Sequence, residues 1–265
     1  MRAWTIALAL AGTAVSLANA ADTFLVVRGD DLYRYDGNTV QTFTLTDTFH
    51  SLSLTEHGII GVSNLQENVG NPPPDFEVWR LDGALSPAPF LTRIDTVTDK
   101  RFPTLTQVGS TLYGIGEGEI YTVAPDFSLT FVTNVNPGEA IGGSGYDAAS
   151  DTFYVSGQTS DALFTLDLGS GNLSQIGTGV GFDFRNQGGE WWRGEYWAAF
   201  EDLTNDRLVL GTIDTTTGLF SIEVVLQNGL GTLGAGQTMG LAIIPTPASL
   251  ALLGLGGLAA ARRRR

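Results

Sequence analysis

Apolar and polar residues alternate with a period of two through most of residues 21–244, and one short pattern recurs within that stretch. The pattern is an aliphatic residue, an aromatic residue, any residue, an apolar residue and an aspartate, as in Leu32–Asp36 and Leu163–Asp167. Related copies begin at Val78, Ile120 and Leu210, about 45 residues apart. A period of two is typical of a half-buried β-strand. The spacing therefore predicts five copies of one β-rich unit.

Each copy has further predicted strands on both sides. A β-rich run precedes it, turn residues such as Asp36-Gly37 follow it, and another β-rich run comes next. In four units a strand rich in small residues stands in front of these three. The first unit lacks this leading strand, and Thr238–Ile244, which belongs to no other unit, is a candidate for it. We therefore expect an all-β fold, a five-bladed β-propeller of four-stranded blades, closed by a C-terminal strand in the N-terminal blade.

Two other all-β architectures fit the strand spacing in part. A two-sheet sandwich has similar spacing between strands, but it does not predict five copies of one motif. A β-solenoid needs repeats shorter than about 45 residues. The propeller accounts for the repeat, and its ring closure leaves only short, protected sheet edges.

The repeat is similar to those of a broad group of bacterial propellers, whose blades read roughly Gly-x-x-Tyr-Asp, then Thr-x-Tyr, then Leu-Tyr-x-Ile-Asp. The copy that carries the resemblance best runs from Gly145-Tyr146-Asp147 through Thr152-Phe153-Tyr154 to Leu163–Asp167. That group includes lyases, hydrolases, lectin-like binders and scaffolds. The resemblance therefore implies a fold and leaves the function open.

The N-terminal segment 1–20 has the layout of a secretory signal peptide. Met1-Arg2 is a short basic start, Ile6–Leu17 is apolar, and Ala18-Asn19-Ala20 has the small-x-small form that precedes a signal-peptidase cleavage site. We expect cleavage between Ala20 and Ala21, with signal peptidase as a partner and export as the result.

The C-terminal segment 245–265 has three consecutive parts. Pro245, Thr246 and Pro247 come first, and the apolar run Ala248–Ala261 follows. The basic end consists of Arg262, Arg263, Arg264 and Arg265. As a helix the apolar run is about 21 Å long, less than the roughly 30 Å of the hydrocarbon core. Cationic flanks stay on the cytoplasmic side, so the tail predicts a transient inner-membrane anchor with residues 21–244 outside.

This three-part tail resembles the PEP-CTERM sorting signal of exported proteins in Gram-negative bacteria. Thr246 stands where that family most often has glutamate. The resemblance implies a partner, the membrane sorting enzyme exosortase, and a final location at the cell envelope surface or outside the cell. It covers residues 245–265 alone and implies nothing about the fold of the rest.

The charge and composition of residues 21–244 limit the classes of partner. Nine lysines and arginines against 28 acidic residues give this segment a formal charge of −19. Such a field repels nucleic acid, so we expect no nucleic-acid partner. The chain has no cysteine, which excludes thiol nucleophiles, zinc–thiolate sites and iron–sulfur clusters. We expect no cofactor, with calcium as a weak alternative.

Several acidic residues fall in the longer predicted connections between strands, on the face where we expect binding. They include Glu67, Glu139, Asp183, Glu201 and Asp202. Paired carboxylates divide acid and base roles in glycoside cleavage when they lie about 5 to 10 Å apart, which makes a polysaccharide lyase or glycoside hydrolase the alternative function. The loop Asp202–Asp206 also offers three oxygen side chains for calcium, but it lacks EF-hand spacing and better fits a polar turn.

Three tryptophans near residue 190 are the candidate ligand-binding residues. Trp191, Trp192 and Trp197 lie within Glu190–Trp197, and aromatic faces of this kind stack on sugar rings. The alternation of a strand puts Trp191 and Trp192 on opposite faces. We therefore expect at least one of them to pack between blades.

Together these patterns predict an exported cell-surface or extracellular-matrix protein with a non-enzymatic binding or structural role. Its tail would direct sorting and processing, and extracellular polysaccharide is the ligand that the tryptophans indicate. The enzyme hypothesis requires clustered acids in a deep axial pocket, whereas the binding hypothesis requires an aromatic patch or a shallow groove. No catalytic, cofactor-binding or metal-binding residue is assigned.

Overall fold

A computed structural model of the protein describes residues 22–64, 76–97, 102–116, 118–231 and 239–246. The chain divides into two compact units, one made of residues 23–244 and one made of residues 1–22 with 245–265. All regular structure in the described residues is β-strand. The expectation of an all-β fold is confirmed for this part of the chain.

The described residues of the unit 23–244 contain eighteen strands. In chain order they are β1 (Thr23–Tyr35), β2 (Val40–Thr55), β3 (Gly58–Asn64), β4 (Phe76–Asp82), β5 (Phe90–Val97), β6 (Thr104–Val108), β7 (Thr111–Gly116), β8 (Glu119–Val123), β9 (Leu129–Asn134), β10 (Ile141–Asp147), β11 (Thr152–Gly157), β12 (Ala162–Leu166), β13 (Leu173–Ile176), β14 (Phe184–Trp192), β15 (Glu195–Asp202), β16 (Arg207–Ile213), β17 (Phe220–Asn228) and β18 (Met239–Ile244). They form three four-stranded sheets, β6–β9, β10–β13 and β14–β17, and one six-stranded sheet in the order β18-β1-β2-β3-β4-β5.

The sequence repeat corresponds to the third strand of each four-stranded sheet. The copies that begin at Ile120, Leu163 and Leu210 lie in β8, β12 and β16. Successive strands pair antiparallel and are joined by turns, as the glycine and aspartate residues between them predict. In the turn between β12 and β13, Gly171 has a φ of +73°, and a Cβ there would lie 1.8 Å from the Asn134 carbonyl oxygen. The turn therefore requires glycine.

The first strand of the six-stranded sheet reverses direction within its own length. Residues Thr23–Arg28 of β1 pair with β18, whereas Asp31–Tyr35 pair with β2. The rings of Phe24 and Tyr35 lie 6.1 Å apart. Eleven residues of straight strand would separate them by about 36 Å. The chain turns at Gly29, which has a φ of +64°. Sequence analysis predicts two strands here, and the two arms of β1 correspond to them.

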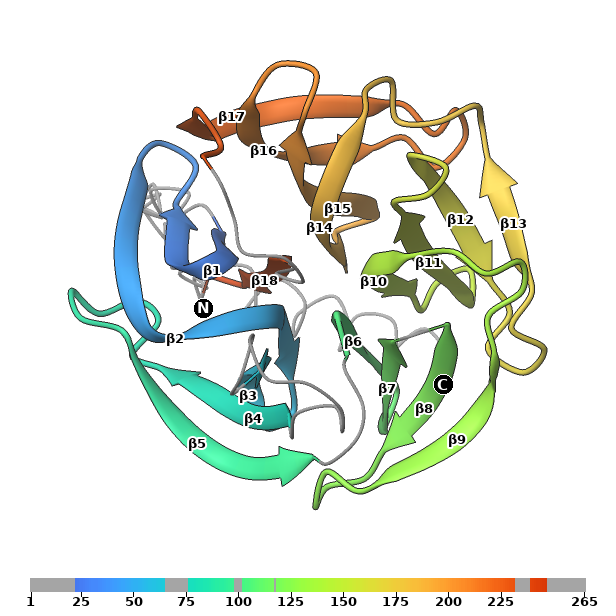
Figure 1. The fold of residues 1–265 in the computed structure, drawn as a ribbon, viewed down its shortest axis with the longest axis horizontal. Coiled ribbons are helices and arrows are strands. Elements are labelled where there is room, and N and C mark those ends of the chain that lie inside the picture. The colour runs from blue at the N-terminus through green and yellow to red at the C-terminus, as the bar shows by residue number, and fades with distance from the viewer. Residues whose placement is uncertain (1–21, 65–75, 98–101, 117, 232–238, 247–265) are drawn as a thin grey trace, which may run out of the picture. The chain divides into compact units, whose positions relative to one another are not determined.

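The second strand changes partners along its length. The first part of β2, Val40–Thr44, pairs with the second arm of β1, and the last part, Phe49–Thr55, pairs mainly with β3. Figure 1 shows the long ribbon of β2 leaving the outer side of β1 and ending near the centre beside β3. The change of partner strand coincides with an irregularity in the register between β2 and β3, which lies between Phe49 and Ser51 of β2.

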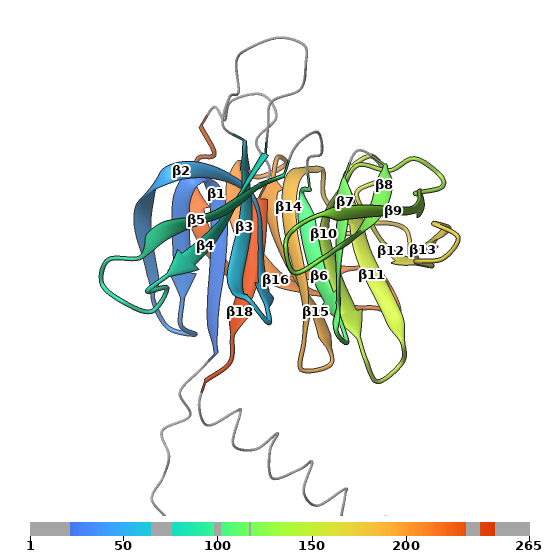
Figure 2. The same ribbon diagram turned by 90° about the horizontal axis from the view of Figure 1, so that it is seen from below.

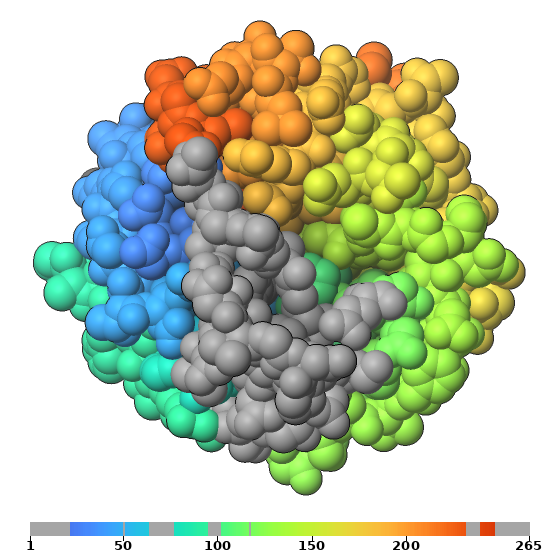
Figure 3. Space-filling view, in the orientation of Figure 1, coloured from blue at the N-terminus to red at the C-terminus, as the bar shows by residue number. Residues whose placement is uncertain are grey.

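The last strand lies beside the first. All six residues of β18 pair with β1, from Ile244 opposite Thr23 to Met239 opposite Arg28. The innermost strands β2, β6, β10, β14 and β18 contact one another in cyclic order. Figure 1 shows the sheets of this unit around a central axis, and the space-filling view shows blue N-terminal segments beside red C-terminal ones (Figure 3). The unit is a β-propeller built from repeated sheets.

The core lies between neighbouring sheets. In the described residues the buried apolar side chains form five clusters. Four of them join strands of two sheets, and the fifth lies within the six-stranded sheet. In one cluster Phe102, which lies just before β6, packs with Ile60 of β3, and in another Leu241 of β18 packs with Leu210 of β16. Each fully buried side chain of this size contributes about 1.5 to 3 kcal/mol. Burial between sheets thus stabilises a fold that has no disulfide.

The innermost strands approach so closely that some positions admit only glycine. A Cβ on Gly240 of β18 would lie 2.0 Å from the Leu52 backbone nitrogen of β2. A Cβ on Gly145 of β10 would lie 2.4 Å from the Trp191 backbone nitrogen of β14. Glycine at such sites lets two backbones come together. This crowding around the axis explains why the leading strands are rich in small residues.

The two ends of the propeller axis carry different connections. The hairpins that follow the innermost strands lie on one side, at residues 56–57, 109–110, 148–151 and 193–194, and we call this side the hairpin face. The connections from one sheet to the next lie on the other side, at residues 135–140 and 177–183 for example, and we call it the long-loop face. Figure 2 shows the hairpin face below and the long-loop face above.

The unit of residues 1–22 and 245–265 is described only at Asp22, Pro245 and Thr246. The backbone amide of Thr246 donates a hydrogen bond of 3.1 Å to the Asp22 carboxylate. The predicted cleavage site, Pro247 and the terminal arginines lie outside the described residues. No helix in the described part of the chain is long and apolar enough to cross a membrane.

Candidate functional site

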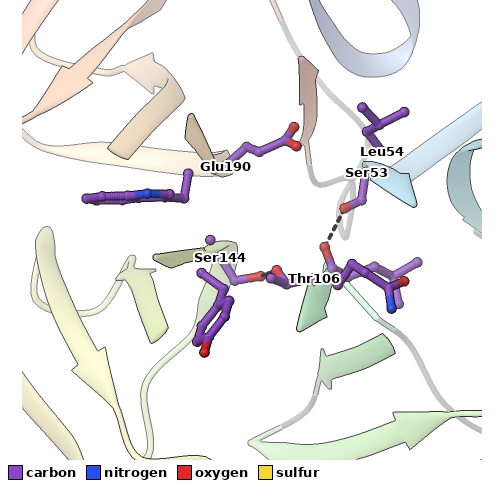
Figure 4. A pocket seen from close by; sticks show the side chains of 11 residues that line it. Ser53, Leu54, Thr106, Ser144 and Glu190 are labelled. Atoms are coloured by element: carbon purple, nitrogen blue, oxygen red, sulfur yellow. Dashed lines mark hydrogen bonds between the residues drawn. The ribbon is translucent and has the colours of Figure 1, made fainter. Parts of the chain in front are cut away.

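A small cavity lies among the innermost strands of the propeller (Figure 4). Its volume is about 80 Å³. A cavity of about 150 Å³ holds one benzene molecule, and a single water needs roughly 10 to 15 Å³. The cavity therefore has room for a few waters or for one small group of a ligand.

Polar side chains from four different strands line this cavity. Among them are Ser53 of β2, Thr106 of β6, Ser144 of β10 and Glu190 of β14. Figure 4 shows Glu190 on one side of the cavity and the three hydroxyl residues on the other. Apolar contact comes from leucines, among them Leu54 and Leu105. The site thus combines one carboxyl group, several hydroxyl oxygens and an apolar wall.

The hydroxyl groups bind one another and the backbone. Ser53 Oγ donates a hydrogen bond to the Leu105 carbonyl oxygen. Ser144 Oγ lies 2.5 Å from Thr104 Oγ1 and also bonds Thr106 Oγ1. Most of the hydroxyl protons are therefore donated to other atoms of the protein. A ligand in the cavity would meet the lone pairs of the hydroxyl oxygens, which can accept hydrogen bonds.

Glu190 is the acidic group of the cavity. Its Oε2 accepts a hydrogen bond of 2.8 Å from the Ile243 backbone amide of β18. Burial raises the pKa of the carboxyl from its ordinary value of 4.5 to about 8, and the Ile243 hydrogen bond offsets this only in part. No charged side chain of the described residues contributes to the shift in pKa. The fold therefore favours the neutral acid near pH 7.

The raised pKa of Glu190 predicts that the protein loses stability as the pH rises between 4.5 and about 8. A carboxyl whose folded pKa lies above its unfolded value stabilises the fold fully below pH 4.5, and this contribution is lost as the pH rises through about 8. Each pKa unit corresponds to about 1.4 kcal/mol, so the loss in unfolding free energy is at most about 5 kcal/mol. Urea unfolding followed by circular dichroism at a series of pH values measures it.

Two variants distinguish the contribution of Glu190 to this pH dependence from the contributions of the other titrating groups. Glu190→Gln keeps an acceptor for the Ile243 amide and removes the titration, so its unfolding free energy should vary less over this pH range. Glu195→Gln lies at an exposed position of the following hairpin and should keep the wild-type pH profile. A Glu190→Gln protein with the wild-type profile would contradict the role of this carboxyl.

The cavity lies toward the hairpin face, whereas sequence analysis places binding on the long-loop face. Its lining residues stand in the last part of each innermost strand, just before the hairpin. Sequence analysis does not single out Glu190. A signal is present in the sequence, because Ser53, Thr106 and Glu190 each stand two residues before the end of a leading strand. Alignment of the repeats by these strand ends would have found it.

Three of the acidic residues expected on the long-loop face, Glu139, Glu201 and Asp202, accept structural hydrogen bonds, whereas Asp183 is exposed. Glu139 accepts bonds from the backbone amides of Thr159 and Ser160 and from the Ser160 hydroxyl. Asp161 lies near Glu139 and Asp183, and its pKa is raised by burial and further by these two charges. The Asp161 carboxylate accepts a bond from the Phe184 amide at 3.2 Å. Glu67 lies outside the described residues.

Glu201 is fully buried and joins the first strand to the last four-stranded sheet. It accepts hydrogen bonds from Arg28 of β1, from Arg185 Nε at 2.7 Å and from Asn186 Nδ2 at 2.9 Å. Arg28 is buried as well and donates a second bond to the Leu230 carbonyl oxygen. This carboxylate therefore holds the fold together, and its oxygens are occupied.

The loop Asp202–Asp206 has the contacts of a polar turn. The Asp202 carboxylate accepts hydrogen bonds from the Asn205 amide at 3.0 Å and from Arg207 Nε at 2.8 Å. The Asp206 carboxylate accepts a bond from the Leu230 amide at 2.9 Å. N–H donors of the protein thus contact these oxygens. Among the described residues, no three acidic or histidine side chains gather at one point that could hold a metal ion.

The three tryptophans do not form one platform. Trp191 stacks on Tyr154, with ring centroids 5.0 Å apart and planes within 6°. Trp192 and Trp197 pack against the cluster on the other side of the sheet, where Trp197 contacts Phe24 at 4.4 Å between ring centroids. Alternation along the strand thus separates Trp191 from Trp192 as predicted. All three are half-buried, and one ring face of Trp191 is covered by Tyr154.

Comparison with known sequences gives no family for this chain. No protein-family model matches it, and no curated protein matches it. The fold is thus the basis on which it can be compared with other proteins.

Solved structures with a similar fold have low sequence identity. A protein of unknown function from Bacteroides caccae is 11% identical, and the match covers 85% of this chain and all of that chain with a TM-score of 0.48. A chain of the nidogen–laminin complex is 10% identical over 85% of this chain and 99% of that chain, with a TM-score of 0.45. Virginiamycin B lyase from Staphylococcus aureus is 9% identical over 78% and 65%, with a TM-score of 0.37. Similarities of this size give no argument about what the chain binds or does.

Proposed function

We propose that the chain is an exported five-bladed β-propeller with a non-enzymatic binding or structural role at the cell surface or in the extracellular matrix. The observation that carries the proposal is the narrow axial cavity, which has a single carboxyl group. It offers a place for one small group of a ligand, and the described residues that line it do not include the paired acids of a polysaccharide-cleaving site.

Five blades of four strands account for the observed strand pairing. The first blade consists of β18, the two arms of β1 and the first part of β2. The second consists of the last part of β2 with β3, β4 and β5, and the three four-stranded sheets supply the others. The cyclic contacts of the innermost strands and the five apolar clusters support this count. In this arrangement β18 closes the N-terminal blade.

The cavity favours binding over polysaccharide cleavage. Glycoside hydrolysis uses two carboxyl groups that flank the bond to be broken. The cavity wall contributes Glu190, and its volume of about 80 Å³ admits the tip of a ligand rather than a polymer chain. An extracellular polysaccharide would therefore be contacted at the surface, where half-buried Trp192 and Trp197 share one side of the sheet.

The two ends of the chain support export and sorting. Residues 1–20 have the features of a signal peptide, with cleavage between Ala20 and Ala21. Residues 245–265 resemble the PEP-CTERM signal and would hold the protein in the inner membrane until an exosortase-like enzyme processes it. The formal charge of −19 on the exported part favours solubility outside the cell.

Replacement of both tail prolines is expected to change location without changing the fold. In a Gram-negative host that has an exosortase, we expect the wild-type protein in the envelope or extracellular fraction, beginning at Ala21 and lacking the arginine end. The Pro245→Ala, Pro247→Ala double variant should remain mostly in the inner-membrane fraction, because the sorting motif is lost. Cell fractionation with mass spectrometry of both termini measures this.

The control is the stability of the folded unit. Both proteins should melt at the same temperature, since β18 ends at Ile244, before the substituted residues. Equal distribution of the two proteins between the fractions would refute tail-directed sorting. A full-length cytoplasmic wild-type protein would refute export altogether.

A further inference from the structure

We infer that the axial cavity binds the ammonium group of a primary alkylamine, with the Glu190 carboxylate as its counter-charge. This inference names a ligand class for the binding role proposed above and rests on that role for its biological setting. Such a group occurs on lysine side chains, on polyamines and on other extracellular amines. The inference is carried by the cavity and by the chemistry of its wall.

The wall offers acceptors, and an ammonium group supplies donors. Ser53 Oγ uses its proton on the Leu105 carbonyl oxygen, and the Ser144 hydroxyl shares protons with Thr104 and Thr106. Lone pairs of these oxygens remain for a ligand, together with the Glu190 oxygen that the Ile243 amide does not bind. An ammonium group has three N–H donors and needs three acceptors. Figure 4 shows the carboxyl and the hydroxyls on opposite sides of the space.

The size and the apolar part of the wall fit a short alkyl stem. Leu54 and Leu105 line the cavity beside the polar groups. A volume of about 80 Å³ holds an ammonium group with a methylene or two, whereas a six-membered ring needs more. A ligand of this shape would place its charge against Glu190 and its carbon chain against the leucines.

A divalent metal ion fits this wall less well. Calcium takes six to eight oxygen ligands, usually with several carboxylates among them. The cavity has one carboxylate, and no three acidic or histidine side chains of the described residues meet at one point. A primary ammonium is satisfied by one carboxylate and two hydroxyl oxygens.

The charge state of Glu190 makes the binding depend on pH. Burial raises the pKa of this carboxyl to about 8. The elements packed around it present Ser53 and Leu54 on β2, Thr106 and Gln107 on β6, Ser144 and Tyr146 on β10 and the Ile243 amide on β18. Of these Tyr146 is titratable, and its hydroxyl is bonded to Asp151. An ammonium ion binds the ionised carboxylate, so binding releases a proton below pH 8 and strengthens as the pH rises toward 9.

The test is a titration of the purified full chain with n-butylammonium, followed by calorimetry and by the shift in melting temperature. We expect saturable binding that is roughly a hundredfold weaker at pH 6 than at pH 9. The reason is that pH 6 lies about two pH units below the pKa of Glu190, so few of the carboxyl groups are ionised there. Glu190→Gln should lower the affinity at pH 9 at least tenfold. Glu195→Gln, an exposed carboxyl in the same sheet, should bind as the wild type does.

Four further probes decide the chemistry. Tetramethylammonium has the charge but no N–H donor, and n-butanol has the stem but no charge, so neither should bind. Calcium or sodium that stabilises the wild type but not Glu190→Gln, while n-butylammonium does nothing, would overturn the inference in favour of a metal ion. Absence of amine binding, or equal binding by Glu190→Gln, would overturn it as well. None of these results bears on export, which the fractionation experiment tests separately.

Discussion

Deletion of Met239–Ile244 is expected to abolish cooperative unfolding of the propeller. These residues form β18, whose six residues pair with β1 and whose apolar side chains are almost fully buried. Met239, Leu241 and Ile243 belong to one cluster and Ala242 to another, so two of the five apolar clusters lose members. At about 1.5 to 3 kcal/mol for each large side chain, the loss equals much of the 5 to 15 kcal/mol that stabilises a typical domain.

Circular dichroism and thermal melting of the purified full chain measure this effect. A single substitution in the same strand gives a graded test, because Leu241→Ala should cost about 2 to 5 kcal/mol of unfolding free energy. Ile222→Ala is the matched control, since Ile222 lies in the outer strand β17 and is 42% exposed. It should change the unfolding free energy by less than about 0.5 kcal/mol. A deletion variant that melts like the wild type would refute closure by β18.

Glu201→Ala is expected to destabilise the protein by about 3 to 5 kcal/mol, since removal of one partner leaves a buried charge without compensation. Glu201 is fully buried, and the Arg28 guanidinium that it binds is 5% exposed. Arg28 stands on β1 and Glu201 on β15, so the pair connects the first strand to the last four-stranded sheet. Urea unfolding at pH 7 measures the change in unfolding free energy.

Two comparisons make this result specific to the buried pair. The double variant Arg28→Met, Glu201→Leu should be less destabilised than Glu201→Ala, because it leaves no buried charge unpaired; Arg185, which also loses its partner, is 40% exposed. Asp82→Asn removes a partner from the more exposed pair Arg80–Asp82 and should cost less than about 1 kcal/mol. If Glu201→Ala were no more destabilising than Asp82→Asn, the pair would not fasten β1 to β15.

Much of the fold could be predicted because the periodicity is local. The pattern Leu163–Asp167 predicts a strand, and β12 covers Ala162–Leu166. The segment Thr238–Ile244 is predicted as a strand without a unit of its own, and β18 covers Met239–Ile244 and pairs with β1. Alternation and turn residues act over a few residues, so they are visible in one sequence.

The candidate site could not be predicted in the same way, because it depends on contacts between distant residues. Glu201 is predicted to lie in a surface loop, yet it is buried and accepts a hydrogen bond from Arg28, which is 173 positions away in the chain. Glu190 gains its raised pKa from burial near the axis and meets the Ile243 amide of β18. These environments arise only when the strands come together around the axis. A sequence read one segment at a time does not contain them.

The pairing of Thr23 with Ile244 has a consequence for the timing of folding. A polypeptide is made from its N-terminus. The strand β1 therefore lacks its β18 partner while more than two hundred further residues are synthesised. The two strands can pair only after the last one has been made, and loop-closure entropy makes such long-range pairing slow. In a chain that is exported as proposed above, this delay would keep the propeller incomplete while the chain crosses the membrane.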